Sequence, residues 1–324
     1  MKQPEATRPK VSVVIATHNR ANLIEEAVQS ILTQTLQGFE VLIVDDFSSD
    51  DTPAVLDGLK RTDERIRIFR TKRNVGPGAT RNLGITEAQG EYIAVLDDDD
   101  IAMPHRLETQ VRVLESDRSI DCVFSNVGYF TDNPNNLKIE PPLLKPGGFP
   151  SDPDDLFKLL YVERNIIQNT TFMARATILK QFPFPAHLWG PEDKVMCLQM
   201  CAKHVRMLGL PDVLVKMRVR PGKSLMTRDP KLVFQARREA IKVMQRWLKA
   251  EGIHRFDKLH RIAWARQLSR EARGRSGLRG LITALAAMGY APRDEFVWNT
   301  FVLLLSRAWS KTQRFFTTDG VSPR

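Results

Sequence analysis

The chain has 324 residues, of which 42% are hydrophobic and 8% aromatic, and a formal net charge of +10. This length and composition exclude a disordered protein and predict one large domain, or a domain of about 200 residues with an appendage. We expect Cys122, Cys197 and Cys201 to be reduced core thiols, which favours a cytoplasmic protein over a disulfide-linked secreted one. Residues 1–10 lack a signal-peptide core, and the apolar stretch at residues 296–309 is shorter than the roughly 20 residues of a spanning helix.

The charge is unevenly distributed along the chain. Residues 1–205 contain 23 Lys and Arg against 29 Asp and Glu, and residues 206–324 contain 25 against 9, so the net charges are −6 and +16. A strongly basic tail is typical of proteins that meet an anionic partner, such as a phospholipid surface, a phosphorylated acceptor or nucleic acid. The alternative is a solvated surface that only maintains solubility.

Strand and helix patterns alternate in the first 100 residues. Near-continuous β-branched or apolar runs, typical of buried parallel strands, occupy residues 11–16, 39–44, 66–69 and 91–96. Helical periodicity between them predicts helices over residues 22–33, from about 48 through 59, and over 79–88. The order predicts an α/β fold with a mostly parallel, Rossmann-like sheet and helices on both faces.

Polar side chains follow three of these predicted strands. Thr17 follows the first strand, Asp45 and Asp46 follow the second, and four adjacent aspartates at residues 97–100 (the acidic run) follow the fourth. Ligands of such sheets bind beyond the carboxyl ends of the strands. The sequence therefore predicts a binding site at this edge.

The acidic run requires compensation, because neighbouring carboxylates repel one another and burial increases the cost. A hard divalent cation, Mg²⁺ or Mn²⁺, is the natural partner of such oxygen ligands and commonly bridges to substrate phosphates. The alternative is an exposed acidic turn that caps a helix beginning at Pro104.

The later elements divide the chain into two regions. We expect a first domain over residues 1–225, with a long surface loop, a candidate lid, at residues 131–153, and a basic α-helical region over residues 226–324. Strands are predicted at residues 120–130 and 170–174 and as two short segments of 205–219, and helices at 104–116, 193–203, 232–250, 256–273, 278–288 and 295–309.

Five segments resemble the inverting family 2 glycosyltransferases of the GT-A fold. They are VSVVIATHNR, FEVLIVDDFSSDDT, RNVGPGATRNLGI, YIAVLDDDDIAMPHRL with an Asp-x-Asp motif, and WGPEDKVMCLQM. Together they cover roughly residues 10–225 in the order of that family. The resemblance implies a metal-dependent transfer of a sugar from a nucleotide donor, a UDP-sugar above all.

The resemblance also implies roles for individual residues on the donor side. Thr17, Asn19 and Asp46 would bind the nucleoside, with Asp46 accepting a hydrogen bond from a uracil-type N–H. Arg81 would lie near the nucleotide. Asp97 and Asp98 would hold the ribose and the sugar. Asp46 is alternatively a strand-end turn residue.

Two further roles concern the metal and the acceptor. Asp99 would be the metal ligand, and Asp193 the general base that deprotonates the acceptor hydroxyl, which predicts inversion at the sugar carbon. Asp193 is alternatively an acid that the helix dipole favours at a helix N-terminus. Many relatives carry a histidine after the last strand, whereas this chain carries Arg218 and Arg220, with Lys223 beyond them, so the two arginines are candidate contacts to the donor diphosphate.

Two features of the sequence have competing explanations. Cys197, Cys201 and His204 share a helix face at metal-ligand spacing, but their apolar neighbours favour a packed core. In the tail, an apolar helical stripe consists of Trp298, Phe301, Val302, Leu305 and Trp309. The stripe either docks on the first domain or the other tail helices, or it binds an anionic membrane surface, which a lipid-linked acceptor would make useful.

We therefore expect a glycosyltransferase that acts on a glycan or lipid-linked glycan acceptor in bacterial-type surface polysaccharide or glycolipid assembly. It would be cytoplasmic or peripheral on the inner face of the membrane. One alternative is a nucleotidyltransferase, which would carry a glycine-rich loop where this chain reads ATHNRANL. The other is a non-enzymatic protein that binds a membrane or nucleic acid, although no nucleic-acid motif is present and no nucleic acid is expected.

Overall fold

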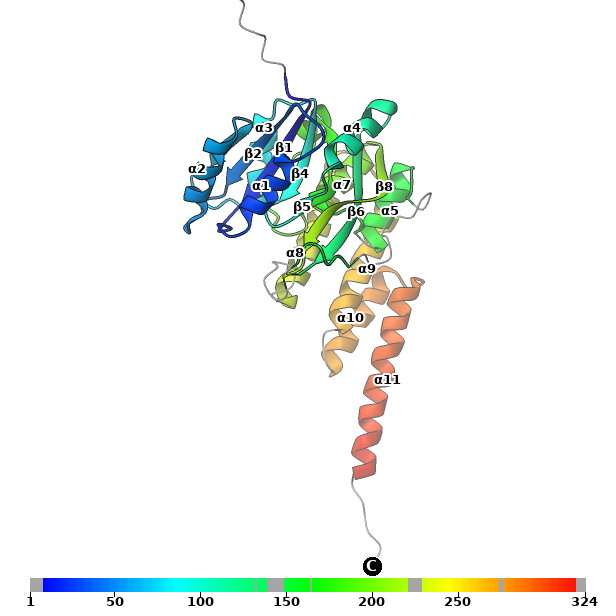
Figure 1. Ribbon diagram of the computed structural model, residues 1–324. Helices are drawn as coiled ribbons and strands as arrows, with labels where there is room; N and C mark the ends of the chain where they lie inside the picture. The colour runs from blue at the N-terminus through cyan, green and yellow to red at the C-terminus, as the bar shows by residue number, and fades with distance from the viewer. Residues whose placement is uncertain are drawn as a thin grey trace, which may run out of the picture. The chain divides into compact units, whose positions relative to one another are not determined.

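The computed structural model describes residues 8–131, 133–138, 149–163, 165–220, 229–273 and 277–318, without the side chains of 230, 277, 278 and 308–318 (Figure 1). Part of the predicted lid (residues 132 and 139–148) and Lys223 lie outside the described residues. The chain divides into a first unit, Met1–Leu160 with Arg164–Arg228, and a second unit, Tyr161–Glu163 with Asp229–Arg324.

The first unit is built on an eight-stranded sheet in the order β3-β2-β1-β4-β7-β6-β8-β5. The strands are β1 (Val11–Thr17), β2 (Phe39–Asp45), β3 (Ile66–Arg70), β4 (Tyr92–Asp97), β5 (Ile101–Ala102), β6 (Cys122–Phe130), β7 (Met173–Arg175) and β8 (Met207–Arg218). Strands β1 to β4 pair in parallel, which confirms the predicted Rossmann-like half. Beyond β4 the sheet is mixed, because β7 runs antiparallel to β4 and β6 while β8 runs parallel to β6.

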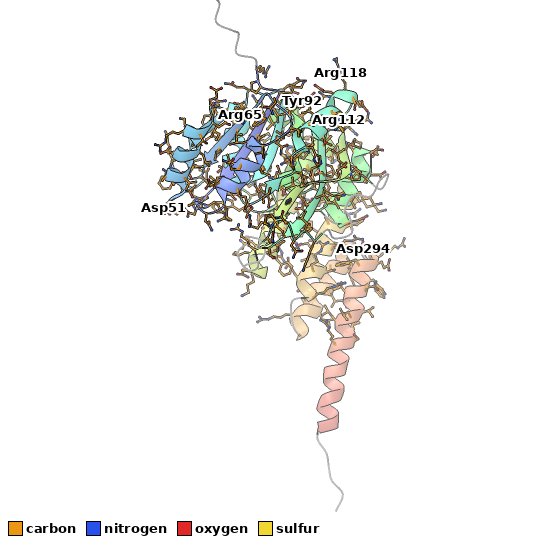
Figure 2. The ribbon with its side chains drawn as sticks, in the orientation of Figure 1. Asp51, Arg65, Tyr92, Arg112, Arg118 and Asp294 are labelled. Atoms are coloured by element: carbon orange, nitrogen blue, oxygen red, sulfur yellow. The ribbon has the colours of Figure 1, made fainter. Side chains whose placement is uncertain are left out.

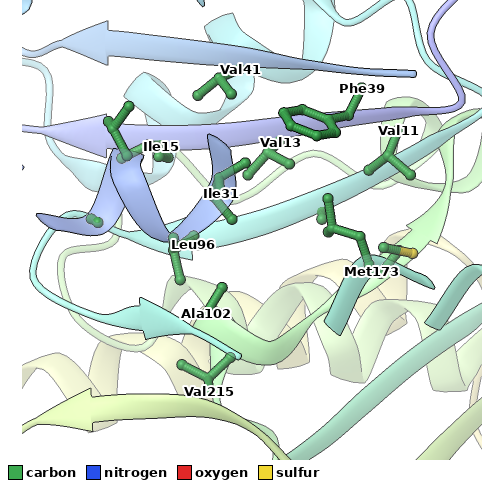
Figure 3. Packing of buried hydrophobic residues seen from close by; sticks show 14 of the residues in the cluster. Val11, Val13, Ile15, Ile31, Phe39, Val41, Leu96, Ala102, Met173 and Val215 are labelled. Atoms are coloured by element: carbon green, nitrogen blue, oxygen red, sulfur yellow. The ribbon is translucent and has the colours of Figure 1, made fainter. Parts of the chain in front are cut away.

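Helices cover both faces of this sheet. α1 (Ile24–Leu32), α2 (Thr52–Thr62) and α4 (Arg106–Ser116) pack on one face through a buried apolar cluster. Figure 3 shows Val13 and Ile15 of β1 and Ile31 of α1 within it. α3 (Pro77–Glu87) packs against β1 and β2 on the other face, where a Cβ at Gly84 would lie only 2.6 Å from Val14. The glycine thus lets α3 approach the sheet closely.

The chain after β4 departs in detail from the predicted elements. The acidic run forms a turn, closed by a bond from Asp100 N to Asp97 O, and residues 101–102 then pair with β8 as β5. α4 consequently begins at Arg106 rather than at Pro104. The two strands predicted around Pro211 are one strand, β8, whose register against β6 shifts there because proline has no N–H to donate.

The remaining helices of the first unit surround the second half of the sheet. They are α5 (Pro153–Lys158), α6 (Ala176–Gln181) and α7 (Glu192–Ala202), with a 3₁₀ turn at Asn169–Thr171. The helix predicted over residues 193–203 is α7. Strand β7 starts later than predicted, because residues 169–171 form the 3₁₀ turn.

The second unit is helical, as predicted from residue 231 onward. Its helices are α8 (Pro230–Ala250), α9 (Asp257–Arg273), α10 (Gly277–Tyr290) and α11 (Glu295–Thr318). Small buried side chains such as Ala265 and Ala287 let α9, α10 and α11 approach one another. In the described part of the chain, none of the helices has both the length and the apolar character needed to cross a bilayer.

The predicted apolar stripe of the tail does not coincide with the buried face of α11. Val297, Thr300 and Leu304 are buried within the unit, whereas Trp298, Val302 and Leu305 are exposed. The side chain of Trp309 lies outside the described residues. Contacts between the helices therefore use a face next to the stripe and leave most of the stripe accessible.

Candidate active site

A cleft of about 580 Å³ lies at the carboxyl ends of β1, β2 and β4, with further walls from α3, β8 and the segment before α7. Eight of the residues singled out in the sequence line it: Asn19, Asp46, Arg81, Asp97, Asp98, Asp99, Arg218 and Arg220. Thr17 and Asp193 are not among its lining residues. Thr17 is buried at the end of β1, and Asp193 lies in the first turn of α7.

The Asp46 carboxylate organises the loop between β3 and α3. It accepts hydrogen bonds from the backbone N–H of Val75 and of Gly76, each at 2.8 Å, and from the Thr71 hydroxyl at 3.0 Å. A carboxylate can accept about four hydrogen bonds. Asp46 thus holds the strand-end loop and retains capacity for about one ligand contact.

His18 and Asn19 tie the turn after β1 to neighbouring loops. His18 Nδ1 lies 2.7 Å from the carbonyl oxygen of Asp46, and its Nε2 lies 3.1 Å from Nδ2 of Asn19 and 3.2 Å from Nδ2 of Asn74. A carbonyl only accepts and an amide NH₂ only donates, so this arrangement fits the neutral ring with its proton on Nδ1. Asn19, at φ +53°, also accepts from the N–H of Ser49. His18 is therefore a hydrogen-bonding residue of the turn.

Arg81 of α3 links the acidic run to α7. Its Nη2 donates to Asp97 at 2.8 Å and its Nη1 donates to Glu192 at 3.0 Å. Burial acts to lower the pKa of Arg81, but the carboxylates of Asp97 and Glu192 outweigh burial and raise it. Glu192 also accepts from the N–H of Gly190 at 2.7 Å, so Arg81 and Glu192 together fix the entry to α7.

The four aspartates of the acidic run have different surroundings. Burial and the charge of Asp99 raise the pKa of Asp98 to about 7, although Arg20 lies 3.6 Å away. Burial and the charge of Asp97 likewise raise the pKa of Asp99. Asp100 is 2% exposed and accepts from the backbone N–H of Arg218, so it anchors the end of β8 rather than capping α4. The run thus carries more negative charge than its surroundings compensate.

Arg218 and Arg220 lie against the acidic run. Arg220 forms an ion pair with Asp99, and Arg218 donates through Nε to the carbonyl oxygen of Asp99 at 3.0 Å while pairing with Glu26 of α1. Both guanidinium groups line the cleft. They are therefore placed where a bound diphosphate and the carboxylates of the run would compete for the same cations.

Sequence reasoning missed a buried cation beneath the run. Arg106 is fully buried and donates to the carbonyl oxygen of Val95 at 2.8 Å and to Gln110 at 3.1 Å. Burial lowers the pKa of Arg106 to about 10, against the opposing effects of Asp100 and Asp97. An Arg two residues after Pro104 is the local signal, but sequence alone places such a residue on the surface.

Asp193 is held at the N-terminus of α7, beside the Arg81 bridge. Burial and the neighbouring Glu192 carboxylate raise the pKa of Asp193 to about 7, against the opposing effects of the Lys194 N–H and Arg81. A carboxyl with this pKa can take up and release protons near neutral pH. It is the property that a general base needs.

Trp189 is a second residue that sequence reasoning passed over. It is 47% exposed and lines the cleft, and a Cβ at Gly76 would lie 2.6 Å from its indole ring. Gly76 has φ +87°, which also favours glycine. The absence of a side chain at Gly76 therefore lets the indole pack directly on the backbone at the rim of the cleft.

The donor chemistry of the acidic run fits a divalent cation. Its carboxylates are hard oxygen ligands, and the pKa values of Asp98 and Asp99 are raised by burial and by neighbouring negative charge, which such a cation would compensate. No group of three or more His, Cys, Asp or Glu side chains in the described residues is arranged as a complete metal site. Protein ligands alone do not form a cage here, and Mg²⁺ characteristically completes its shell with substrate phosphates and water.

The thiols of α7 are not part of such a site. Cys197 and Cys201 are buried and His204 is exposed, so the prediction of a packed helix face is confirmed for the two thiols. Burial raises the pKa of Cys197, which favours an inert thiol.

Residues 12–180 match the family described as glycosyl transferase family 2, and the chain belongs to that family. An uncharacterised glycosyltransferase of Methanocaldococcus jannaschii is 31% identical over 217 residues, which are 66% of this chain and 72% of that protein. An uncharacterised glycosyltransferase of Rickettsia felis is 35% identical over 213 residues, but the match spans only 33% of that longer protein. The family sets aside the nucleotidyltransferase alternative.

Two further relatives belong to glycan assembly. The GalNAc(5)-diNAcBac-PP-undecaprenol beta-1,3-glucosyltransferase of Campylobacter jejuni is 40% identical over 102 residues, 31% of this chain and 33% of that protein. The succinoglycan biosynthesis protein ExoO of Rhizobium meliloti is 44% identical over 103 residues, 32% of this chain and 29% of that protein.

Solved structures share the fold. S. aureus TarS 1–349 in complex with UDP-GlcNAc has a TM-score of 0.58 at 17% identity, with 94% of this chain and 92% of that chain covered. The mannosyltransferase PcManGT of Pyrobaculum calidifontis, in complex with GDP-Man and Mn²⁺, has a TM-score of 0.54 at 21% identity, with 95% and 88% covered. The fold is thus that of the GT-A glycosyltransferases, with helices at the C-terminus.

Proposed function

We propose that the protein transfers a sugar from a UDP-sugar to an acceptor hydroxyl, with inversion and with a divalent metal. One observation carries this proposal: a single cleft collects Asp46, the acidic run and Arg81, and Arg81 bonds directly to the residue next to Asp193. Membership of glycosyltransferase family 2 supplies the reaction class. The finer statements, on donor, metal and stereochemistry, rest on the chemistry of these residues.

Donor binding would use the edge formed by β1, β2 and β4. Thr17, Asn19 and Asp46 would hold the nucleoside, and Asp46 has capacity for about one more hydrogen bond, as a uracil N–H requires. Arg81, Asp97 and Asp98 would hold the ribose and the sugar. Structural neighbours in complex with UDP-GlcNAc and with GDP-Man support a nucleotide-sugar donor.

The departing diphosphate needs positive charge. Asp99, with Asp98 beside it, would hold Mg²⁺ or Mn²⁺, which supplies Lewis-acid stabilisation of the diphosphate when bound. Arg218 and Arg220 would add their charge from the end of β8. Because Arg220 pairs with Asp99, donor binding would shift Arg220 from this carboxylate to the diphosphate.

Asp193 would act on the acceptor. Its carboxylate takes the proton of the acceptor hydroxyl while that oxygen bonds to the anomeric carbon of the sugar. The bond from this carbon to the diphosphate oxygen breaks, and the electron pair leaves with the nucleoside diphosphate. Attack from the face opposite the leaving group inverts the anomeric carbon, so a single base at α7 is sufficient.

The acceptor would be a glycan or a lipid-linked glycan in surface polysaccharide or glycolipid assembly. Two relatives support this class: a glucosyltransferase that acts on an undecaprenol diphosphate-linked glycan and a succinoglycan biosynthesis protein. Residues 229–324 carry 19 Lys and Arg against 8 Asp and Glu, and exposed apolar side chains such as Trp298 accompany this charge. We propose that this unit holds the enzyme on an anionic membrane surface at the cytoplasmic face.

A donor screen tests the proposal. UDP-, GDP- and dTDP-sugars are added with and without Mn²⁺, and the unfolding temperature and the release of nucleoside diphosphate are followed. We expect protection and release with a UDP-sugar that depend on Mn²⁺. Protection by none of the three donors contradicts the proposal. Protection by GDP-sugars alone overturns the assignment of the base but leaves the reaction class standing.

A further inference from the structure

Three arginines gather around one aromatic ring in the second unit, and the charge of a fourth acts on one of them. The guanidinium carbons of Arg266, Arg270 and Arg273 on α9 lie 5.8, 5.6 and 4.4 Å from the centroid of the Phe296 ring on α11. Arg237 of α8 is exposed and near enough to act on the charge of Arg270. We call Arg237, Arg266, Arg270 and Arg273 the arginine cluster.

Members of the cluster differ in their partners. Arg266 donates at 2.9 Å to Asp294, which is labelled in Figure 2. Arg273 donates to the Thr300 hydroxyl at 2.9 Å. Burial lowers the pKa of Arg270, and the positive charges of Arg237, Arg266 and Arg273 lower it further. Arg270 is therefore a partly buried cation, stacked on Phe296, whose charged neighbours oppose its charge.

Such an arrangement is costly without an anion. Guanidinium groups bind phosphate oxygens with paired, charge-assisted hydrogen bonds, and an aromatic ring stacked under the guanidinium group limits its motion. Arg266 is occupied by Asp294, which leaves Arg270 and the exposed Arg237 as the members that can turn to a ligand. We propose that the arginine cluster is a binding site for a phosphate group, with Arg270 and Arg237 as its main ligands.

The phosphate would come from the headgroup of an anionic membrane lipid. Helices α10 and α11 of the same unit expose large apolar side chains, among them Ile282 at 56%, Leu285 at 50% and Val302 at 47%. Apolar side chains beside a cationic site are typical of an interfacial surface. The source of the phosphate rests on the proposed membrane association, whereas the site itself does not.

Three single substitutions in the full chain test this site. Arg270→Gln and Arg237→Gln remove cluster charges, and Arg246→Gln is the matched control, because Arg246 is an exposed arginine of α8 outside the cluster. Binding is measured by flotation with phosphatidylcholine vesicles with and without phosphatidylglycerol. Inorganic phosphate and chloride of equal ionic strength are compared as additives in thermal unfolding.

We expect Arg270→Gln to weaken binding to the anionic vesicles about tenfold and Arg246→Gln about twofold at most. Phosphate should raise the unfolding temperature of the parent chain, and less so that of Arg270→Gln. Without phosphate, Arg270→Gln should unfold at the same temperature or higher, because it relieves repulsion within the cluster.

Other outcomes separate the claims. Equal weakening by Arg270→Gln and Arg246→Gln would mean diffuse attraction and overturn the site, while membrane association stands. Specific phosphate protection without vesicle binding keeps the site and overturns its lipid source. If phosphate gives no protection and the chain does not bind the vesicles, both claims are overturned. A lower unfolding temperature of Arg270→Gln contradicts the strain on which the inference depends, and Arg237→Gln then decides whether the cluster binds phosphate.

Discussion

Arg81 Nη1 lies 3.0 Å from Glu192 Oε1, and this ion pair joins the helix after β3 to the helix that carries Asp193. The other arm of Arg81 reaches Asp97 at the end of β4. One side chain thus connects the acidic run, the cleft and the candidate base. The position of α7 relative to the sheet edge depends on this buried cation.

Replacing Arg81 by Met should lower the free energy of unfolding by about 3–5 kcal/mol, because it leaves Glu192 with an uncompensated buried charge. Arg112→Met, at an exposed position of α4, is the control and should change it by no more than about 0.5 kcal/mol. Urea unfolding of the two variants measures the difference. Equal midpoints would show that the bridge contributes nothing to stability.

The pKa of Asp193, raised to about 7, predicts a pH dependence of sugar transfer. A general base acts when deprotonated, so kcat/KM for the acceptor should increase as the pH rises through about 7 and then level off. Asp193→Asn should abolish transfer and leave the affinity for the nucleotide donor largely intact. A pH profile in which kcat/KM does not rise through about pH 7, or an active Asp193→Asn variant, would remove Asp193 from the mechanism.

The same shift predicts an effect on stability. A carboxyl whose pKa is higher in the folded than in the unfolded state stabilises the fold fully below the unfolded-state pKa, near 3.8. This stabilisation is lost as the pH rises to the folded-state pKa of about 7. Relative to the parent chain, Asp193→Asn should therefore be more stable at pH 8 than at pH 4. Thermal unfolding at the two pH values checks the sign.

The ion pair between Arg220 and Asp99 predicts opposite effects of its two partners on metal binding. Asp99→Asn should weaken the Mn²⁺-dependent binding of UDP, since it removes the proposed ligand. Arg220→Gln should strengthen the binding of Mn²⁺ alone, because it frees Asp99, and should slow turnover. Calorimetric titration with Mn²⁺ before and after UDP separates the two. Weaker Mn²⁺ binding by Arg220→Gln would contradict this competition.

Gly76→Ala should cost about 1–3 kcal/mol of stability, because the new Cβ meets the Trp189 indole at 2.6 Å and the backbone has φ +87°. Its matched control is Gly58→Ala, within α2 and with nothing within 4 Å, which should be stabilising by about 0.5–1 kcal/mol. Unfolding curves and tryptophan fluorescence report both effects. Equal stability of the two variants would show that Trp189 moves aside freely.

The sequence signals that proved reliable were local ones. Apolar runs such as residues 11–16 and 39–44 determine buried strands, and parallel strands bring their carboxyl ends to one edge, so Asp46 and the acidic run were predicted to meet. This part of the fold and of the cleft followed from the composition, the hydrophobic periodicity and the order of the predicted strands and helices.

Other parts of the site depend on contacts between distant segments, which no local pattern encodes. Glu192 pairs with Arg81, and Gly76 leaves room for the Trp189 indole. In each case the two residues are more than 100 positions apart in the sequence. Arg106 is polar in sequence, yet it is fully buried, and it donates to the backbone carbonyl of Val95 and to the Gln110 side chain. The pairing of residues 101–102 with β8 likewise required the position of a strand about 115 residues away.

Release of UDP from a UDP-sugar in the presence of Mn²⁺ is the measurement that tests the central claim most directly. The account predicts release by the parent chain, its loss on chelation of the metal, and its loss in Asp193→Asn while UDP binding persists. Absence of both binding and release with every nucleotide-sugar, or release that is unchanged by Asp193→Asn and Asp99→Asn, would contradict it.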